Sequence, residues 1–274
     1  MFSQRILVTA VLLPIGIAAI LAGGIWFSVL IAIILVLAIR EYLQLFRTGG
    51  FQPSGFVLYV GVLALLAARH FGGFEYDYAV LPLWAMLTIS IHLIAFEGGR
   101  NQAATDFAIT LAGLFYIGYL GSYFLALRSL PEGTWWILLV LPGGWAADSG
   151  AYMIGNAFGK HKLAPRLSPK KSWEGYFGGI LSALIITPLL ALLYRRFWLP
   201  VDTQITLVRA AMIGVVMGIL PTLGDLGISM LKRQFGVKDT GNLLPGHGGV
   251  LDRIDSWLWM VSLGYLLVRW FILG

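Results

Sequence analysis

Long apolar runs recur along the whole chain, and no other feature of the sequence restricts its fold as strongly. A helix needs about 20 consecutive apolar residues to cross a hydrocarbon core of about 30 Å. We identify nine runs near this length, and the first three of them are short. They cover residues 6–22, 25–39, 56–68, 78–96, 107–127, 135–155, 176–197, 205–231 and 254–273. Only 12% of the residues are charged, whereas a soluble domain carries about 25%. The sequence therefore predicts an all-α, polytopic integral membrane protein with about nine transmembrane helices.

The first apolar run has a second interpretation. Arg5 precedes it and small residues lie near Ala22, as in a secretory signal peptide. We favour a transmembrane hairpin, because the next run begins after only two glycines. No repeat or soluble domain interrupts the runs. We therefore divide the chain into N-terminal transmembrane helices, 1–130, and a C-terminal half, 131–274, which carries the most charged connections.

Two basic loops in the second half set the expected orientation. The loop 156–175 carries five lysines and arginines against one acid, Glu174, and the loop 232–253 is also rich in basic residues. Loops of this kind stay on the cytoplasmic side, so the N-terminus is expected inside and the C-terminus outside. Arg195 and Arg196, on the opposite side in this scheme, argue against it. The net charge of +6 suits anionic lipid headgroups and requires no nucleic acid partner.

Two aspartates, Asp148 and Asp225, lie within apolar runs. Ionisable groups in a membrane are costly, so each is a candidate functional residue. Pro221 and Gly224 weaken the helix around Asp225 and expose backbone carbonyls there. Alternatively, each aspartate is a buried residue that only forms a hydrogen bond with a neighbouring helix.

The loop 156–175 offers lysines for phosphate and glycines that allow the backbone to approach closely. It is not a Walker A loop, because only three residues separate the glycines of "GNAFGK" and no Ser or Thr follows Lys160. The basic residues of this loop are explained equally well if the loop only fixes the orientation of the protein in the membrane.

The loop 232–253 is different, because it mixes charges of both signs. Basic residues alternate with Asp239 and Asp252, and Asp255 follows at once. This mixture suggests a phosphate site that also holds a divalent cation, and carboxylates suit magnesium. His247, between two glycines, either contacts phosphate or braces the loop.

At this point the sequence resembles a known family. The stretch "SMLKRQFGVKDTGNLLPGHGGVLDRID", from Ser229 to Asp255, is similar to the signature of the phosphatidate cytidylyltransferases, also called CDP-diacylglycerol synthases. All the positions fixed in that signature are present: Ser229, Lys232, Arg233, Lys238, Asp239, Gly241, Pro245, His247, Gly248, Gly249, Asp252, Arg253 and Asp255. Upstream, "DSGAYMIGNAFGKHKL" and "SPKKSWEGYFGG" also resemble the family, with Ser172 where Thr is common.

The resemblance implies an enzyme that makes CDP-diacylglycerol and pyrophosphate from CTP and phosphatidate, using magnesium, alone or with a second cation. It implies a homodimer and a multi-pass protein of the inner (plasma) membrane whose active site faces the cytoplasm, with 131–274 as the catalytic half. Asp225 and Asp252 are the implied metal ligands, and Asp148, Asp255 and His247 are second candidates for the same centre. The implied phosphate-binding and catalytic residues are Lys232, Arg233, Lys238, Lys170, Lys171, Ser168, Ser172, His247, Gly248, Gly249 and Arg253.

Other functions fit parts of the sequence. CTP-dependent lipid-alcohol kinases and CDP-archaeol synthases resemble the family in their nucleotide half, but "HGGVLDRID" favours the cytidylyltransferase over the kinase. A CDP-alcohol phosphotransferase is disfavoured, because its core motif is absent. A secondary transporter with broken helices and midplane carboxylates is the alternative of another class. The position of most charges in loops argues against it.

Overall fold

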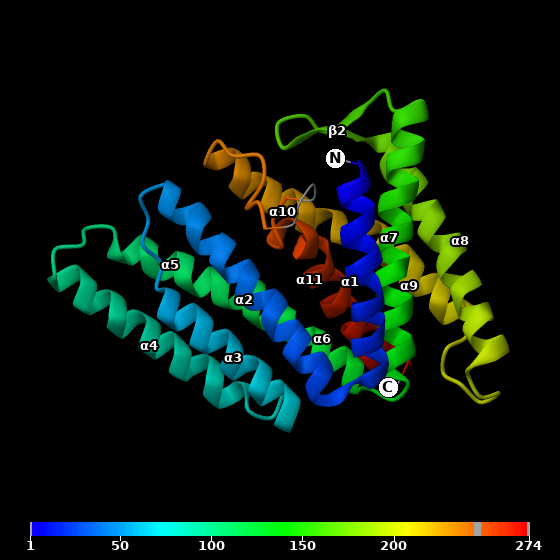
Figure 1. Ribbon diagram of the computed structural model, residues 1–274, viewed down its shortest axis with the longest axis horizontal. Helices are drawn as coiled ribbons and strands as arrows, with labels where there is room; N and C mark the ends of the chain where they lie inside the picture. Colours follow the sequence, from blue (N-terminus) through cyan, green and yellow to red (C-terminus); the bar gives the residue numbers. More distant parts are fainter. Residues whose placement is uncertain (1, 244–247, 273–274) are drawn as a thin grey trace. The chain divides into compact units, whose positions relative to one another are not determined.

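The computed structural model describes residues 2–243 and 248–272, which are helical almost throughout (Figure 1). The elements are α1 (Phe2–Ala22), α2 (Gly24–Thr48), α3 (Gly55–Gly72), α4 (Asp77–Glu97), α5 (Ala103–Gly113), the π-helix η1 (Leu114–Tyr119), α6 (Leu120–Ser129), α7 (Gly133–Phe158), β1 (Lys162–Ala164), β2 (Ser168–Ser172), α8 (Trp173–Phe197), α9 (Leu207–Ile219), α10 (Pro221–Gln234), α11 (Leu251–Leu267) and the π-helix η2 (Val268–Ile272). The predicted all-α class is confirmed.

Among the residues that the structure describes, seven helical stretches are long and apolar enough to cross a membrane. They are Gly24–Thr48, Gly55–Gly72, Asp77–Glu97, Ala103–Ser129, Gly133–Phe158, Trp173–Phe197 and Leu207–Gln234. A polytopic membrane protein is thus confirmed, but the count of nine is not. Helix α1 contributes an apolar stretch, Ala10–Ala22, that is not among these seven. Helix α11 has 17 residues and carries Asp252 in its first turn, so part of its length is polar.

The chain forms two compact units, each built from two separate segments. Unit 1 consists of Met1–Ala126 and Lys232–Ile254, and unit 2 of Leu127–Leu231 and Asp255–Gly274. The division proposed from the sequence, at residue 130, gives two consecutive parts of the chain, whereas each unit of the structure combines two separate segments. In the structure, the segment Lys232–Ile254, called the signature segment below, belongs with the N-terminal helices.

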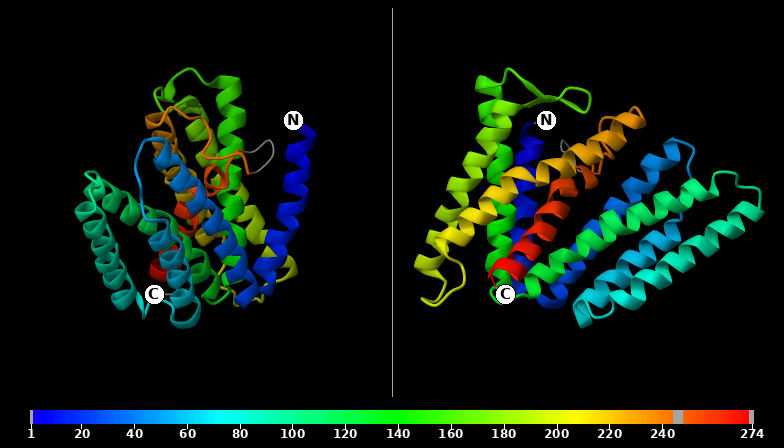
Figure 2. Two further views of the ribbon diagram at one scale, coloured as in Figure 1. Left: turned by 60° about the vertical axis from the view of Figure 1, so that its left-hand side comes forward. Right: turned by 180° about the vertical axis from the view of Figure 1, so that it is seen from behind.

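Unit 1 is a set of neighbouring apolar helices. Helix α3 packs against α2, α4 and η1, and α4 packs against α5, as Figure 2 shows. Its core includes Leu35, Ile39, Leu58 and Ile117, none of which is exposed. Helix α5 approaches α2 closely because residue 113 is glycine; a Cβ there would lie 2.7 Å from the Tyr42 ring. This packing fixes α2, which carries part of the candidate site.

Unit 2 is built on close contacts between α7, α8 and α9. Small residues allow them: a Cβ at Gly179 would lie 2.7 Å from the Ala147 carbonyl oxygen, and one at Gly218 would lie 2.7 Å from Ile180 Cα. Such residues let helix backbones approach within a membrane. The antiparallel strands β1 and β2 connect α7 to α8 (Figure 1). Helix α10 begins at Pro221, as expected for a residue that cannot continue the hydrogen bonding of α9.

Candidate functional site

Asp252 lies in the first turn of α11 and is held from two sides within unit 1. Its Oδ1 accepts a hydrogen bond of 2.7 Å from Lys232 Nζ, and both side chains are largely buried. Its Oδ2 accepts from the backbone N–H groups of Thr240 at 2.8 Å and Gly249 at 3.0 Å. Burial raises the pKa of Asp252, but Lys232 and these N–H groups outweigh it and hold the pKa below its ordinary value. Asp252 is therefore ionised at neutral pH.

Glu41 of α2 belongs to the same cluster, although sequence analysis did not single it out. It is buried, with 4% of its surface exposed. Its carboxylate accepts hydrogen bonds from the N–H groups of Val250, at 2.9 Å, and Leu251, at 2.8 Å. The Thr240 hydroxyl lies 3.0 Å from Glu41 Oε2 and 3.0 Å from Asp252 Oδ2. One hydroxyl thus links the two carboxylates.

The glycines of the signature segment surround these carboxylates. Gly248 has a φ of 82°, in the left-handed region that favours glycine. A Cβ at Gly241 would lie 2.6 Å from Glu41 Oε1, and a Cβ at Gly249 would collide with both Glu41 and Thr240. The buried carboxylates therefore explain why these positions hold glycine.

A second charged cluster lies in unit 2, at Asp225 of α10. Lys171 of β2 forms an ion pair with Asp225 Oδ2, and both side chains are partly exposed. Ser229 Oγ lies 3.5 Å from Asp225 Oδ1. Asp148 of α7 is exposed, and both Lys171 and Asp225 act on it electrostatically. Three elements of unit 2 thus bring two of the predicted carboxylates and one predicted lysine together.

The β1–β2 hairpin carries the other predicted residues of its loop. Lys170 is exposed, and Ser168 begins β2 opposite Ala164. Ser172 is buried and forms the N-cap of α8, where its Oγ accepts from Gly175 N–H at 3.2 Å. This capping accounts for a hydroxyl side chain at that position.

The remaining predicted residues differ in exposure. Arg233, Lys238 and Arg253 are exposed. Asp255 is buried in unit 2, and its Oδ1 accepts from Ser256 N–H at 2.6 Å. His247 lies outside the described residues, so its two predicted roles stay predictions.

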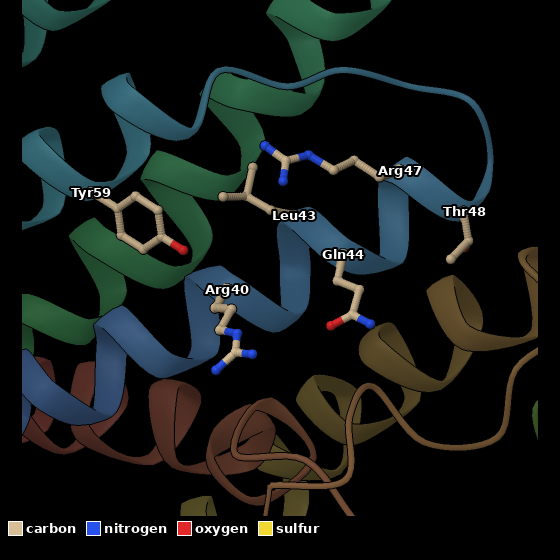
Figure 3. A pocket seen from close by; sticks show the side chains of 6 residues that line it. All are labelled: Arg40, Leu43, Gln44, Arg47, Thr48 and Tyr59. Carbon is tan, nitrogen blue, oxygen red and sulfur yellow. The ribbon is translucent and has the colours of Figure 1, made fainter.

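A pocket of about 420 Å³ lies in unit 1 (Figure 3). It is lined by Arg40, Leu43, Gln44, Arg47 and Thr48 of α2 and by Tyr59 of α3. Neither arginine forms an ion pair with any carboxylate that the structure describes. The two guanidinium groups make the pocket suitable for an oxyanion such as phosphate.

Asp225 and Asp252, each considered within its own unit, suit a magnesium ion whose other ligands are water and substrate oxygens. Within residues 2–243 and 248–272, no three His, Asp or Glu side chains gather at one metal-binding position. Magnesium does not need such a cage, because it commonly takes one or two carboxylates together with water and phosphate oxygens. Asp225 keeps 33% of its side chain exposed. Among the described residues, Asp252 Oδ1 has one hydrogen-bond partner, Lys232. Each retains a lone pair for a cation.

Comparison with known proteins gives one consistent result. The model of a family described as "Cytidylyltransferase family" matches residues 3–271. A phosphatidate cytidylyltransferase of Synechocystis is 34% identical, over 97% of this chain and 96% of that protein. Proteins of the same name from Staphylococcus saprophyticus and Staphylococcus aureus are each 32% identical, over 96% of this chain and 98% of theirs.

Proposed function

The chain belongs to the cytidylyltransferase family, and from this premise we propose that it transfers the cytidylyl group of CTP to phosphatidate, giving CDP-diacylglycerol and pyrophosphate. The observation that carries the proposal is the nearly full-length similarity to relatives named phosphatidate cytidylyltransferase. The Asp252–Lys232 pair and the Asp225–Lys171 pair supply charged groups in a chain that is otherwise mostly apolar.

The reaction needs positioning more than acid–base chemistry. A phosphate oxygen of phosphatidate attacks the α-phosphorus of CTP. The bond between that phosphorus and the bridging oxygen breaks, and pyrophosphate leaves. The second pKa of a phosphate monoester is about 6, so the nucleophile is largely ionised at neutral pH. The protein must bring two polyanions together and stabilise the charge at the reacting phosphate.

The basic residues divide into two groups by their surroundings. Lys232 and Lys171 are held by aspartates, so their ammonium groups have defined positions. Lys170, Lys238 and Arg253 are exposed, and we assign them to contacts with the triphosphate or the lipid phosphate. Fixed charges suit the reacting centre, because they need no reorganisation during the reaction.

Magnesium is part of the proposal. Bound magnesium would neutralise charge on the triphosphate. Asp225 and Asp252 remain its proposed ligands, with a second cation as an open alternative. Of the second candidates, Asp148 is exposed on α7, whereas Asp255 is buried.

The proposal also covers the membrane location, the orientation and the oligomeric state of the protein. We place the protein in the inner (plasma) membrane, with the loops 156–175 and 232–253 and the active site facing the cytoplasm. The excess of lysine and arginine in these loops supports this orientation. A homodimer is proposed from the family resemblance.

Incubation of the purified protein with labelled CTP, phosphatidate and magnesium tests the activity. We expect labelled CDP-diacylglycerol and one pyrophosphate per product, and no product when magnesium is chelated. CDP together with a phosphorylated lipid alcohol would identify a kinase instead. Selective use of the ether-linked archaeal lipid would identify a CDP-archaeol synthase. Counterflow of substrate through proteoliposomes without nucleotide turnover would identify a transporter.

A further inference from the structure

Helix α2 holds the signature segment at both of its ends. Near the start of the segment, the Phe235 ring packs against Phe46, with ring centroids 5.1 Å apart. Near its end, Glu41 accepts the N–H groups of Val250 and Leu251. The segment that carries Lys232 and Asp252 is therefore fixed by contacts from a helix more than 180 residues earlier in the chain.

Glu41 is an unusual group to place at this position. It is buried, and no ion pair that the structure describes includes it. Hydrogen bonds from backbone N–H groups at the start of α11, together with the positive end of that helix, replace the water that its charge has lost. Capping alone does not explain it, since a serine or asparagine next to the helix in sequence serves that purpose.

The Thr240 hydroxyl connects Glu41 to Asp252. It lies 3.0 Å from one oxygen of each carboxylate, but it has only one proton to donate. Asp252 in turn holds Lys232 at 2.7 Å. The position of Glu41 thus affects the position of Asp252 through two routes, the Thr240 hydroxyl and the first turn of α11.

We infer that Glu41 is a positioning residue of the reaction, which keeps the Asp252–Lys232 pair in its reactive geometry without touching the substrate. The inference rests on the proposed function, because the reaction is what reveals the loss of position. A carboxylate is needed, because both of its oxygens must accept hydrogen bonds. Oε1 accepts the Val250 N–H, and Oε2 accepts the Leu251 N–H and also lies within hydrogen-bond distance of the Thr240 hydroxyl.

The test compares Glu41→Gln with Glu97→Gln, which makes the same chemical change at an exposed residue of α4. In either orientation of the glutamine amide, its NH₂ group faces the N–H of Val250 or Leu251. Because an NH₂ group is a donor, it cannot accept that hydrogen bond. We expect kcat to fall about 10-fold to 100-fold, as for groups that orient metal ligands, with KM for phosphatidate nearly unchanged. Hydrogen exchange of the Val250 and Leu251 amides should accelerate. Glu97→Gln should match the wild type in all three measurements.

Thr240→Val supplies a second route to the same answer, because it removes the hydroxyl and leaves Glu41 in place. We expect kcat to fall in Thr240→Val as well. The kcat of the double variant should be no lower than that of the less active single variant, as expected for residues that act as a unit. If Glu41→Gln lowers the Tm too far to assay, Thr240→Val decides alone.

The outcomes separate the two proposals. A wild type that makes no CDP-lipid would defeat the proposed function. If the wild type is active, an unchanged kcat in folded Glu41→Gln would overturn the positioning role. Where only Thr240→Val can be assayed, an unchanged kcat in that variant would overturn it. Effects that multiply independently in the double variant would overturn it too.

Discussion

At the scale of single residues, the candidate site shows buried charges that each have a specific partner. Asp252 has Lys232, and Glu41 has the amides that begin α11. Removing one member of a buried charged pair typically costs about 3–5 kcal/mol, because the other charge remains buried without compensation. The glycines beside these groups are part of the same arrangement, since their missing side chains leave the space that the carboxylates occupy.

Gly249→Ala tests this packing. A Cβ there would collide with Glu41 Oε2 and Thr240 Oγ1, so we expect the carboxylate to be displaced and turnover to fall at least 10-fold. Gly16→Ala is the control, because a Cβ at Gly16 has no heavy atom of a described residue within 4 Å. Turnover and Tm of both variants are the measurements. Equal turnover in Gly249→Ala and the wild type would show that the site tolerates displacement of Glu41.

At the scale of elements, strand β2 gives two adjacent lysines different surroundings. Successive side chains of a strand point to opposite sides. Lys171 accordingly pairs with Asp225 of α10, whereas Lys170 is exposed. The sequence "KK" does not distinguish them, but the hairpin does. The break at Pro221, where α9 gives way to α10, positions Asp225 within the same unit.

Single alanine substitutions should separate the two lysines. We expect Lys171→Ala to lower kcat and to reduce Tm slightly, because Asp225 loses its cation. Lys170→Ala should leave Tm unchanged and raise KM for CTP or phosphatidate several-fold, because only a contact with phosphate is lost. Steady-state kinetics with each substrate and thermal unfolding are the measurements. Identical kinetic changes in the two variants would contradict the division of roles.

At the scale of the whole molecule, the chain combines membrane-spanning helices with two discontinuous units. Helix α8 separates the basic loop 156–175 from the connection that contains Asp202. The positive-inside rule places the former in the cytoplasm. Arg195 and Arg196, at the other end of α8, are the charges that oppose this orientation.

The absence of cysteine makes the orientation directly measurable. Arg166→Cys and Asp202→Cys each introduce a single thiol at an exposed position. In intact cells, an impermeant maleimide should label residue 202 alone, and in inverted vesicles it should label residue 166 alone. Labelling of both from one side would mean that α8 does not span the membrane. The reversed pattern would overturn the proposed orientation.

The sequence by itself determined the class of fold and part of the candidate site. Backbone groups in hydrocarbon must bond within their own segment, so apolar runs of this length allow little except helices. The loop 232–253 also revealed Asp252 and Lys232, because charged residues are conspicuous in an apolar chain. The same reasoning gave nine spans, of which seven are confirmed within the described residues. Helix α11 has 17 residues and begins with the charged Asp252, so a hydropathy count alone does not settle whether it crosses the membrane.

Only the tertiary structure revealed Glu41, the partners of Lys171 and Lys232, and the membership of the signature segment in unit 1. Glu41 ends an apolar run beside Arg40, and in sequence it looks like a residue at a membrane surface. Its partners lie about 200 positions further along the chain. Local periodicity reports which side of a helix is buried, but not what it is buried against. The pairing of a carboxylate with distant amides is set by packing, because a buried charge is stable only where the whole fold brings enough donors to it.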